Sequence, residues 1–405
     1  MSPKIVIACL LCLGVLSSPV LLCADDVTTL ESVLQRALND SPLVKEIERR
    51  TLLQQGEGIA LGSLENPALD AELRIPTSYR ESRGASEVTV ALSQPLRWSD
   101  FGVRGRVNAL IQRSAQIEKK IALLEFAQSI RLAYAKSWLI ESRLDQLRSY
   151  QQKAEGLRVS LEGAKDRGLV GEGEGHLLLA ELRKTSLLLS AWQSDHERAR
   201  AELERIAGFQ IVGRVARPPL EEIPQHALDS NDSEIPMRTR AELAVKLAQE
   251  QQRLARLDAY PKFAPRAVYE RTNDYTDYFG VGIALELPVF NRNRHEQRTR
   301  AAEVSAAELN KNYLTGERFQ NELDALRSSV NTGVKLVRAY ESEVLPALRA
   351  ALSAEERVLH SGQGSPFRVW QMLRELSATE AELIERTLAL YRDRAALSSL
   401  TGCDL

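Results

Sequence analysis

The stretch GVGIALELPVFNRNR, residues 280–294, decides the fold. From Gly280 to Leu287, small or polar residues alternate with valine, isoleucine and leucine. A period of two is that of a β-strand with one polar and one apolar face. Pro288 ends this pattern, and residues 292–360 are then rich in arginine, glutamate, glutamine and alanine. The sequence therefore predicts an amphipathic strand that leads into one very long helix.

Residues 1–24 have the pattern of a signal peptide. Lys4 precedes the apolar run Ile5–Leu22, and Ala24 is a small residue at a suitable cleavage position. The run is about as long as the shortest membrane-spanning helices, but the small exit residue and the acidic pair after it favour cleavage. Lipidation of Cys23 stays open, although the leucine before it is larger than that cleavage site prefers. The sequence thus predicts export from the cytoplasm.

Composition narrows the class of protein further. Beyond the first 24 residues the chain has one cysteine, Cys403, so packing must hold the fold without an internal disulfide. The net charge is −2 with 27% charged residues, which argues against a nucleic-acid partner because no basic surface is indicated. Interspersed charges of both signs are typical of long solvated helices. No second apolar run is long enough for a transmembrane helix, so a membrane role would need strands.

The chain repeats itself at an offset of 194 residues, and such repeats decide the architecture. The first repeat covers 25–208, a linker expected at mid-height covers 209–233, and the second repeat covers 234–405. The matching pairs include Pro67 with Pro261, Arg104 with Arg298, Arg106 with Arg300, Gly168 with Gly362, and Gly208 with Gly402.

Both repeats have the same predicted order of elements: a helix, a β-hairpin, a very long helix, a glycine-rich tip and a closing helix. In the first repeat these elements cover 28–62, strands 67–75 and 86–95 of hairpin 67–95, then 100–166, 167–175 and 176–207. In the second they cover 234–258, strands 261–271 and 278–288 of hairpin 261–288, then 292–360, 361–366 and 367–401.

The long helices carry coiled-coil spacing. Val103, Leu110, Ile117 and Leu124 are seven residues apart, and such a repeat makes helices wrap around one another. Each long helix would run roughly 100 Å, too far for one globular domain. The helix lengths predict that the closing helix of the first repeat stacks end to end with the opening helix of the second.

The four predicted strands alternate polar and apolar residues and have the length of a tilted strand that crosses a bilayer. An ordinary sheet packed on a core stays an alternative, but the chain offers few other apolar segments to cover such a sheet. Because the smallest membrane barrels have about eight strands, several chains must share one. Three chains would supply about twelve strands, enough for a water-filled lumen.

Several motifs together resemble the TolC-like outer-membrane efflux family, and in particular its cation (heavy-metal) efflux branch. They are LELPVFNRNRHEQ (285–297), its echo LSQPLRWSDFGVRGR (92–106), RGLVGEGEG (167–175), and the repeat endings ERIAGF and SSLTG. The resemblance implies a mainly α protein with a small β part: a homotrimer whose shared twelve-stranded barrel lies in outer-membrane lipid. It also implies an α-helical barrel across the periplasm that docks on a membrane-fusion adaptor and an inner-membrane RND-type pump.

The resemblance also assigns site residues. Adaptor-docking tips would comprise Gly168, Leu169 and Val170 in the first repeat, and Gly362, Gln363, Gly364 and Ser365 in the second. The second tip departs from the usual pattern, since Gln363 and Gly364 stand where the first repeat has Leu169 and Val170. The junction between barrel and helices would comprise Pro95, Pro288, Asn291, Arg292 and Arg294.

Glu172 and Glu174 lie in the first tip and, in a trimer, would form rings of carboxylates at the narrow end of a channel. Acidic rings attract cations and tune selectivity. We expect these residues to gate or select, while a role as solvated loop charges stays an equal alternative.

No enzymatic chemistry is indicated. VGEGEG (170–175) follows a predicted helix rather than a strand, so it is not read as a nucleotide-binding loop. The five histidines lack the spacing of metal ligands, and no catalytic constellation appears. The sequence therefore predicts no cofactor, no bound metal and no enzyme, but a passive efflux conduit. An exported coiled-coil scaffold or adhesin without a pore is the alternative.

Overall fold

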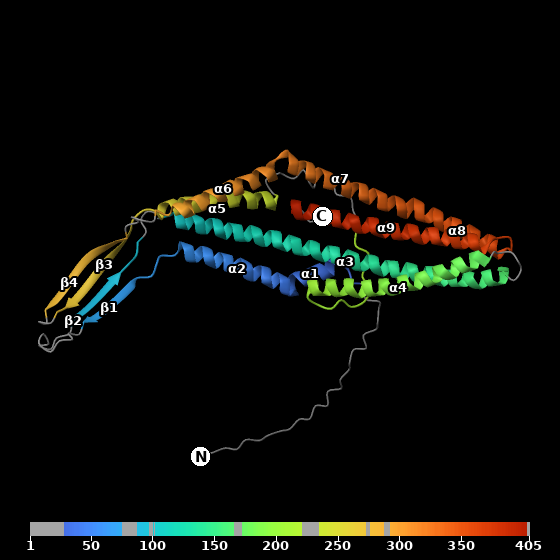
Figure 1. The fold of residues 1–405 in the computed structure, drawn as a ribbon, viewed down its shortest axis with the longest axis horizontal. Helices are drawn as coiled ribbons and strands as arrows, with labels where there is room; N and C mark the ends of the chain where they lie inside the picture. Colours follow the sequence, from blue (N-terminus) through green and yellow to red (C-terminus); the bar gives the residue numbers. More distant parts are fainter. Residues whose placement is uncertain are drawn as a thin grey trace, which may run out of the picture.

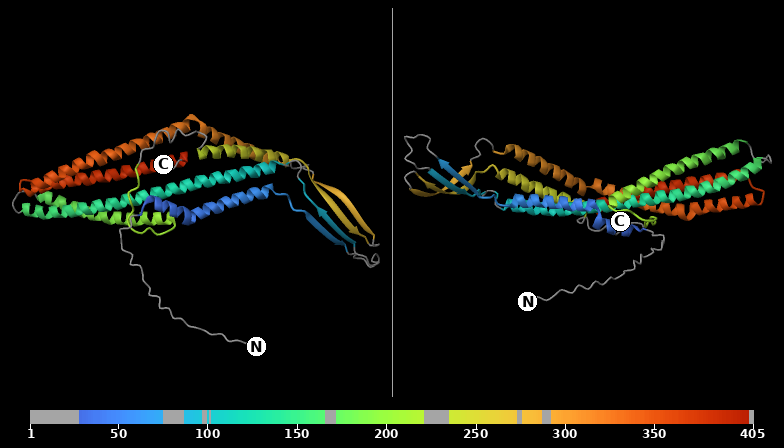
Figure 2. Two further views of the ribbon diagram at one scale, coloured as in Figure 1. Left: turned by 180° about the vertical axis from the view of Figure 1, so that it is seen from behind. Right: turned by 90° about the horizontal axis from the view of Figure 1, so that it is seen from below.

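The structure, a computed structural model, describes residues 28–74, 87–96, 100, 102–165, 172–220, 235–272, 276–286 and 292–402. The chain forms a long rod of helices with a four-stranded sheet at one end (Figure 1). Two further views show that the far ends of the α3–α4 and α8–α9 pairs lie together at the other end (Figure 2). The predicted fold class, mainly α with a small sheet, is confirmed. The predicted signal peptide, 1–24, lies outside the described residues.

The first repeat opens with two helices, α1 (Leu30–Asp40) and α2 (Pro42–Gly62), so the prediction of one helix over 28–62 is wrong in this detail. Ser41 separates them with extended backbone, and its hydroxyl accepts a hydrogen bond from the amide of Leu43, 3.3 Å away. The same hydroxyl donates to the carbonyl of Ile206, 2.9 Å away. Ser41 at the N-cap and Pro42 at the first helical position make a strong helix start, which explains the break.

The predicted long helix of the first repeat is present as α3 (Val103–Lys165), a single helix of 63 residues. It contacts α2, α4 (Glu172–Ala207), α5 (Pro236–Leu257) and α9 (Pro366–Thr401). Its face toward α1 and α4 buries Ile130 and Tyr134, and its face toward α8 and α9 buries Tyr150 and Leu157. Helix α3 is therefore the spine on which both repeats pack.

The second long helix is interrupted, so the prediction of one helix over 292–360 is wrong in this respect. Helix α6 (Arg294–Thr315) ends at Gly316, and α7 (Glu317–Ala339) begins beyond it. A π-helical turn, η4 (Tyr340–Val344), then joins α7 to α8 (Leu345–His360). Pro346, the second residue of α8, has no amide proton, so the regular hydrogen-bond ladder is interrupted there.

The closing helices stack differently from the prediction. Gly208 directly follows α4 and packs on Pro42 of the same repeat, and Gly402 directly follows α9 and packs on Pro236 of the same repeat. Figure 1 shows α4, α1 and α2 following one another on one side of α3, and α9 followed by α5 on the other. The predicted stacking of 176–207 on 234–258 is therefore wrong, because each closing helix meets the opening helix of the same repeat.

The four strands form one antiparallel sheet in the order β1 (Ala68–Arg74), β2 (Glu87–Ser93), β3 (Lys262–Arg271) and β4 (Asp277–Glu286). Residues 94–96 extend the β2–β3 pairing, since the amide of Leu96 donates to the carbonyl of Phe263 at 3.0 Å. The two hairpins of the two repeats thus merge into one continuous sheet.

The described part of the linker, 209–220, lies beside α1 and α3 about halfway along the rod (Figure 1). Thr28 and Val215 form a parallel bridge, and the amide of Thr28 donates to the carbonyl of Arg214 at 2.9 Å. Ile211 and Val215 are buried in the cluster that α1, α3 and α4 share. The segment therefore holds the first described residues of the chain against the spine.

Candidate functional site

The sheet has two chemically different faces. Residues directly opposite each other in an antiparallel pair share a face, so the register joins Leu69 with Leu92 and Tyr269 with Phe279 on one side. The register also places Arg271 and Asp277 at one end of this face, beside Val88. Its other members are Leu69, Ala71, Leu73, Val88, Val90, Leu92, Phe263, Pro265, Ala267, Tyr269, Phe279, Val281, Ile283 and Leu285.

The opposite face carries polar and charged groups. Its pairs include Glu72 with Thr89, Arg74 with Glu87, Ser93 with Arg266 and Lys262 with Glu286. The alternation read from the sequence therefore describes the faces of the folded sheet correctly.

The apolar face is uncovered in the single chain. The side chains of Val281 and Phe279 expose 82% and 77% of their surface, and Leu69 and Ile283 expose more than half. Soluble monomers rarely expose a contiguous apolar patch of this kind, and such a patch marks a membrane or protein contact. Among the described residues, β1 and β4 each pair with one neighbour, so both edges of the sheet can accept another strand.

The junction between the sheet and the helices contains features that sequence reasoning missed. Asp100, which is almost fully buried, accepts a hydrogen bond from Nε of Arg104 at 2.6 Å, and Arg104 also donates to the carbonyl of Leu61. In the second repeat Asn293 has a φ of 54° and donates to the carbonyl of Ala255 at 3.1 Å. The sequence signal that could have found this turn is an asparagine at the start of the predicted helix, because asparagine adopts a left-handed backbone more readily than most residues.

The predicted junction residues are only partly placed. Pro95 follows β2, beside Gln94, whose backbone N–H donates to the carbonyl of Pro265 at 3.1 Å. Arg292 and Arg294 are exposed at the start of α6, where a cation opposes the helix dipole. For the described ranges, neither arginine has an ion pair within 4.0 Å. Pro288 and Asn291 lie outside the described residues.

The second tip is a tight turn between α8 and α9. Gly362 has a φ of 79°, and the amide of Gln363 donates to the carbonyl of Val358 at 3.3 Å. A Cβ on Gly364 would lie 2.6 Å from the backbone nitrogen of Leu359, so this position has no room for a side chain. Ser365 caps α9 by accepting a hydrogen bond from the amide of Phe367 at 3.3 Å.

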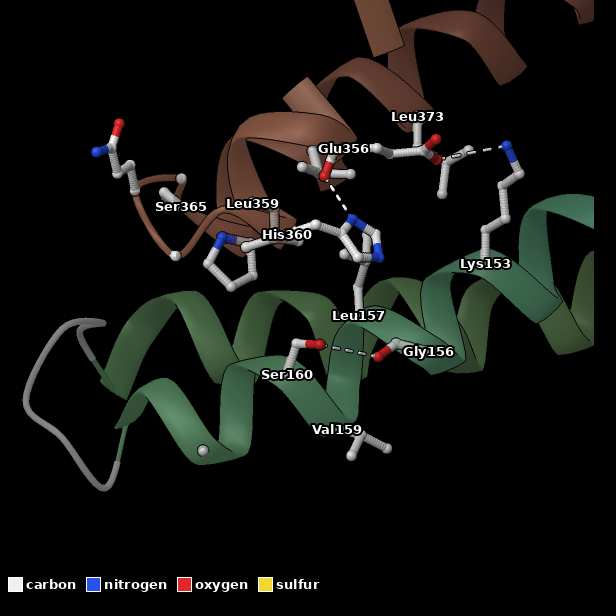
Figure 3. A pocket seen from close by; sticks show the side chains of 16 residues that line it. Lys153, Gly156, Leu157, Val159, Ser160, Glu356, Leu359, His360, Ser365 and Leu373 are labelled. Carbon is white, nitrogen blue, oxygen red and sulfur yellow. Dashed lines mark hydrogen bonds and ion pairs between the residues drawn. The ribbon is translucent and has the colours of Figure 1, made fainter. Parts of the chain in front are cut away.

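A groove of about 760 Å³ lies between this tip and α3 (Figure 3). Leu157 and Leu373 form part of its apolar lining, and Nζ of Lys153 lies 3.5 Å from a carboxylate oxygen of Glu356 across it. Nδ1 of His360 donates to the carbonyl of Glu356 at 2.6 Å. All four predicted residues of the second tip, Gly362, Gln363, Gly364 and Ser365, line this groove.

The first tip is described only in part. Gly168, Leu169 and Val170 lie outside the described residues, as does the side chain of Glu172. Glu174 is half-buried in the first turn of α4, where a carboxylate is favoured by the helix dipole. The predicted roles of Glu172 and Glu174 stay predictions.

Within the described ranges, no three histidine, cysteine, aspartate or glutamate side chains come close enough to hold a metal ion. The same residues contain no helix whose length and apolar character would let it cross a membrane.

Comparison with known proteins agrees with this geometry. Residues 238–403 match the family model described as outer membrane efflux protein. No curated protein matches the chain in sequence. This match confirms the resemblance to the outer-membrane efflux family. The location of that family agrees with the outer-membrane location that the resemblance implies for this chain.

Solved structures share the fold over most of the chain. The outer membrane protein VceC from Vibrio cholerae has a TM-score of 0.74 at 16% identity, with 92% of this chain and 96% of VceC covered. CusC, whose structures concern folding and transmembrane channel formation, has a TM-score of 0.66 at 14% identity over 92% and 91% of the two chains. The outer-membrane channel OprN has a TM-score of 0.68 at 14% identity over 92% and 89%. At these identities the likeness establishes the fold.

Proposed function

We propose that this chain is the channel subunit of a tripartite efflux system, embedded in the outer membrane and extending into the periplasm. The observation that carries the proposal is the sheet, which has one uncovered apolar face, one polar face and two edges that can accept strands. Three such sheets would supply about twelve strands, a size that encloses a water-filled lumen. The matched family and the fold shared with outer-membrane channels support this reading.

In this proposal the protein performs no reaction. The edge β1 of one chain pairs with β4 of the next, the apolar faces contact lipid and the polar faces line the pore. The helices continue the pore as a tunnel through the periplasm. Substrate moves passively, and an inner-membrane RND-type pump supplies the energy.

The groove at the second tip is the proposed docking site for the helical hairpin of a periplasmic adaptor. Its apolar lining includes Leu157 and Leu373, and Lys153 and Glu356 provide charges at its rim. Gly168, Leu169 and Val170 are proposed to contribute the matching part of the first tip. Glu172 and Glu174 are proposed to attract cations at the narrow end of the channel.

Metal cations are the proposed substrate class, a proposal that rests on the resemblance of residues 285–297 to the cation-efflux branch. A cation would be cargo in this account and would need no resident ligand set. Growth of a deletion strain on metal salts tests it: restored tolerance on complementation supports the proposal, and unchanged tolerance to every metal salt contradicts it.

Channel formation is tested by single-channel recording in planar lipid bilayers. The wild-type protein should give stable conductance steps. Val281→Arg places a cation on the apolar face, at about 2–4 kcal/mol per chain at mid-membrane depth, and should abolish insertion. Thr89→Arg is the matched control on the polar face and should insert normally. Equal insertion of both variants would contradict the assignment of the two faces.

A further inference from the structure

The two repeats differ at one point of their long helices. Gly316 interrupts the second long helix with extended backbone, at φ −84° and ψ 164°. The equivalent residue of the first repeat, Ala122, lies within the unbroken α3. Figure 1 shows the resulting bend where α6 meets α7, whereas α3 runs on beside it. We call this bend the joint, meaning residues 314–319.

Arg238, in the first turn of α5, contacts both sides of the joint. Only 6% of its surface is exposed. Its Nε donates a hydrogen bond of 2.9 Å to the carbonyl of Leu314 at the end of α6. Its guanidinium lies 5.7 Å from the ring centre of Phe319 in the first turn of α7, within range of a cation–π contact. One side chain therefore connects the end of one helix with the start of the next.

The buried charge and the helix break depend on each other. The guanidinium of Arg238 lies near the N-terminus of α5, where the helix dipole disfavours a cation. Because this guanidinium is also buried, it needs a hydrogen-bond acceptor. The C-terminal end of α6 supplies one, because helix ends leave carbonyl groups without an intrahelical partner. In an unbroken helix, the carbonyl of Leu314 would instead accept the amide four residues further on. The break at Gly316 thus makes this carbonyl available to Arg238.

The first repeat supports this account by having neither feature. Val44 stands at the position equivalent to Arg238 and is also buried, with 6% of its surface exposed. The neighbouring stretch of α3 at Ala122 is continuous helix and has no free carbonyl to offer. An apolar residue therefore accompanies the unbroken helix, and an arginine accompanies the broken one.

The joint lies at one end of a long run of helices whose other end lies beside the groove. From Gly316 the helices α7, η4 and α8 continue to His360 beside the groove. At 1.5 Å per residue this arm is roughly 65 Å long, so a change of about 5° at the joint would move its end by about 6 Å. Glu356 and Leu359 of α8 form one wall of the groove, and Lys153 and Leu157 of α3 form the opposite wall.

We infer that Arg238 is a positioning residue that fixes the angle of the joint and thereby sets the width of the groove at the second tip. The role of that groove in docking rests on the proposed function. The effect of Arg238 on groove width does not, because this run of helices lies within a single chain.

The inference is tested by measuring the distance between spin labels on the two walls. Val159→Cys on α3 and Val358→Cys on α8 place labels at exposed positions, in a Cys403→Ser background. The labelled mature protein, residues 25–405, is extracted in detergent and diluted with unlabelled protein, so that each distance lies within one chain. Double electron–electron resonance then gives the distance distribution.

Arg238→Met keeps the length of the side chain but removes the donor, and it should shift or broaden the distribution by about 5 Å or more. Arg238→Lys retains the charge and a donor and should restore much of the wild-type distribution. Arg238→Val combined with Gly316→Ala recreates the arrangement of the first repeat and should give a narrow distribution at a new distance. Arg240→Met, two residues along the same helix, is the control and should match wild type.

A wild-type distribution for folded Arg238→Met would overturn the inference. If that variant fails to fold, the double variant decides the question: a narrow new distance supports the role of Arg238, and the wild-type distance refutes it. Conductance and trimer mass, measured on the same preparations, report separately on the proposed channel. A failure of the channel proposal is therefore distinguishable from a failure of the joint.

Discussion

Gly208 ends α4 directly against Pro42: a Cβ at Gly208 would lie 2.6 Å from Cδ of that proline. The second repeat has the same contact, since a Cβ at Gly402 would lie 2.5 Å from Cδ of Pro236. Both glycines have positive φ, 84° and 70°. The end of each closing helix and the start of each opening helix are thus joined by a contact that only glycine allows.

We expect Gly208→Ala and Gly402→Ala each to destabilise the protein by about 2–5 kcal/mol. Alanine with positive φ is strained by roughly 1–2 kcal/mol, and the clash with a rigid proline ring adds a further cost of about 1–3 kcal/mol. Thermal unfolding followed by circular dichroism measures the loss.

Gly105→Ala is the matched control for these two substitutions. Gly105 lies within α3, and a Cβ there would meet no atom within 4 Å. Alanine is a better helix former than glycine by about 1 kcal/mol, so this variant should be as stable as wild type or more stable. If all three variants unfolded alike, the Gly–Pro contacts would not hold the stacked helices together.

Two buried tyrosines predict loss of stability at alkaline pH. Burial raises the pKa of Tyr134 to about 12, and its hydroxyl donates to the carbonyl of Thr28 at 2.7 Å. Burial likewise raises the pKa of Tyr391 to about 12, and its hydroxyl donates to the carbonyl of Pro218 at 3.2 Å. Because the folded pKa exceeds the unfolded value of about 10, this stability is complete below pH 10 and is lost as pH rises toward 12.

The measurement is the unfolding temperature between pH 9 and pH 12. The double variant Tyr134→Phe/Tyr391→Phe should be less stable than wild type at pH 9, because two hydrogen bonds are lost, but its unfolding temperature should fall less steeply with pH. Tyr260→Phe changes an exposed tyrosine and should behave as wild type. Parallel pH profiles for wild type and double variant would show that these tyrosines do not control alkaline unfolding.

The position of Thr28 bears on the processing of the N-terminus. Thr28 lies five positions after Cys23, and a fully extended segment of five residue steps spans about 18 Å. Helices α1 and α2, with 11 and 21 residues, lie between Thr28 and the sheet and span about 48 Å. A lipid on Cys23 could not reach a bilayer at the sheet, so we expect cleavage after Ala24.

Intact-mass spectrometry of the protein purified from outer membranes checks this expectation. The predicted mass is that of residues 25–405 without an acyl group. A chain that begins at an acylated Cys23 would show that the sheet does not lie in the membrane as proposed, or that Thr28 leaves its contacts with residues 212–216.

The acidic residues of the first tip predict the ion preference of the channel. Glu172→Lys/Glu174→Lys reverses the charge of the proposed rings. It should lower the cation preference of single channels, because positively charged lysines at a constriction repel cations. Glu197→Lys changes an exposed carboxylate of the same helix away from the tip and serves as the control. Unchanged selectivity in the tip variant would show that both residues are solvated charges at the start of α4 and do not select ions.

The sequence predicted the parts of the fold that periodicity controls. Alternation in 280–287 and in the three other strands indicated the two faces that the register of the sheet now displays. Heptad spacing in 103–124 indicated the unbroken helix α3. These patterns involve residues close together in the chain, so the amino-acid sequence alone is enough to find them.

Other features depend on contacts between distant residues. Helix lengths alone allow α4 to stack on either opening helix, and only the fit of Gly208 to Pro42 decides between them. Ser41 before Pro42 is a helix-start signal that could have revealed the first break. The break at Gly316 is harder to foresee from the sequence. Arg238, which donates to the carbonyl of Leu314 beside the break, lies 76 residues away from Leu314 in the sequence.

The most direct test of the central claim is the mass of the protein extracted in detergent from fractionated membranes, measured by light scattering with the detergent contribution subtracted. The account predicts that the protein is in the outer-membrane fraction and that its mass equals three chains, because one sheet cannot close a barrel alone. A monomer or dimer in the soluble periplasmic fraction would contradict the shared barrel, and the chain would then be an exported coiled-coil scaffold.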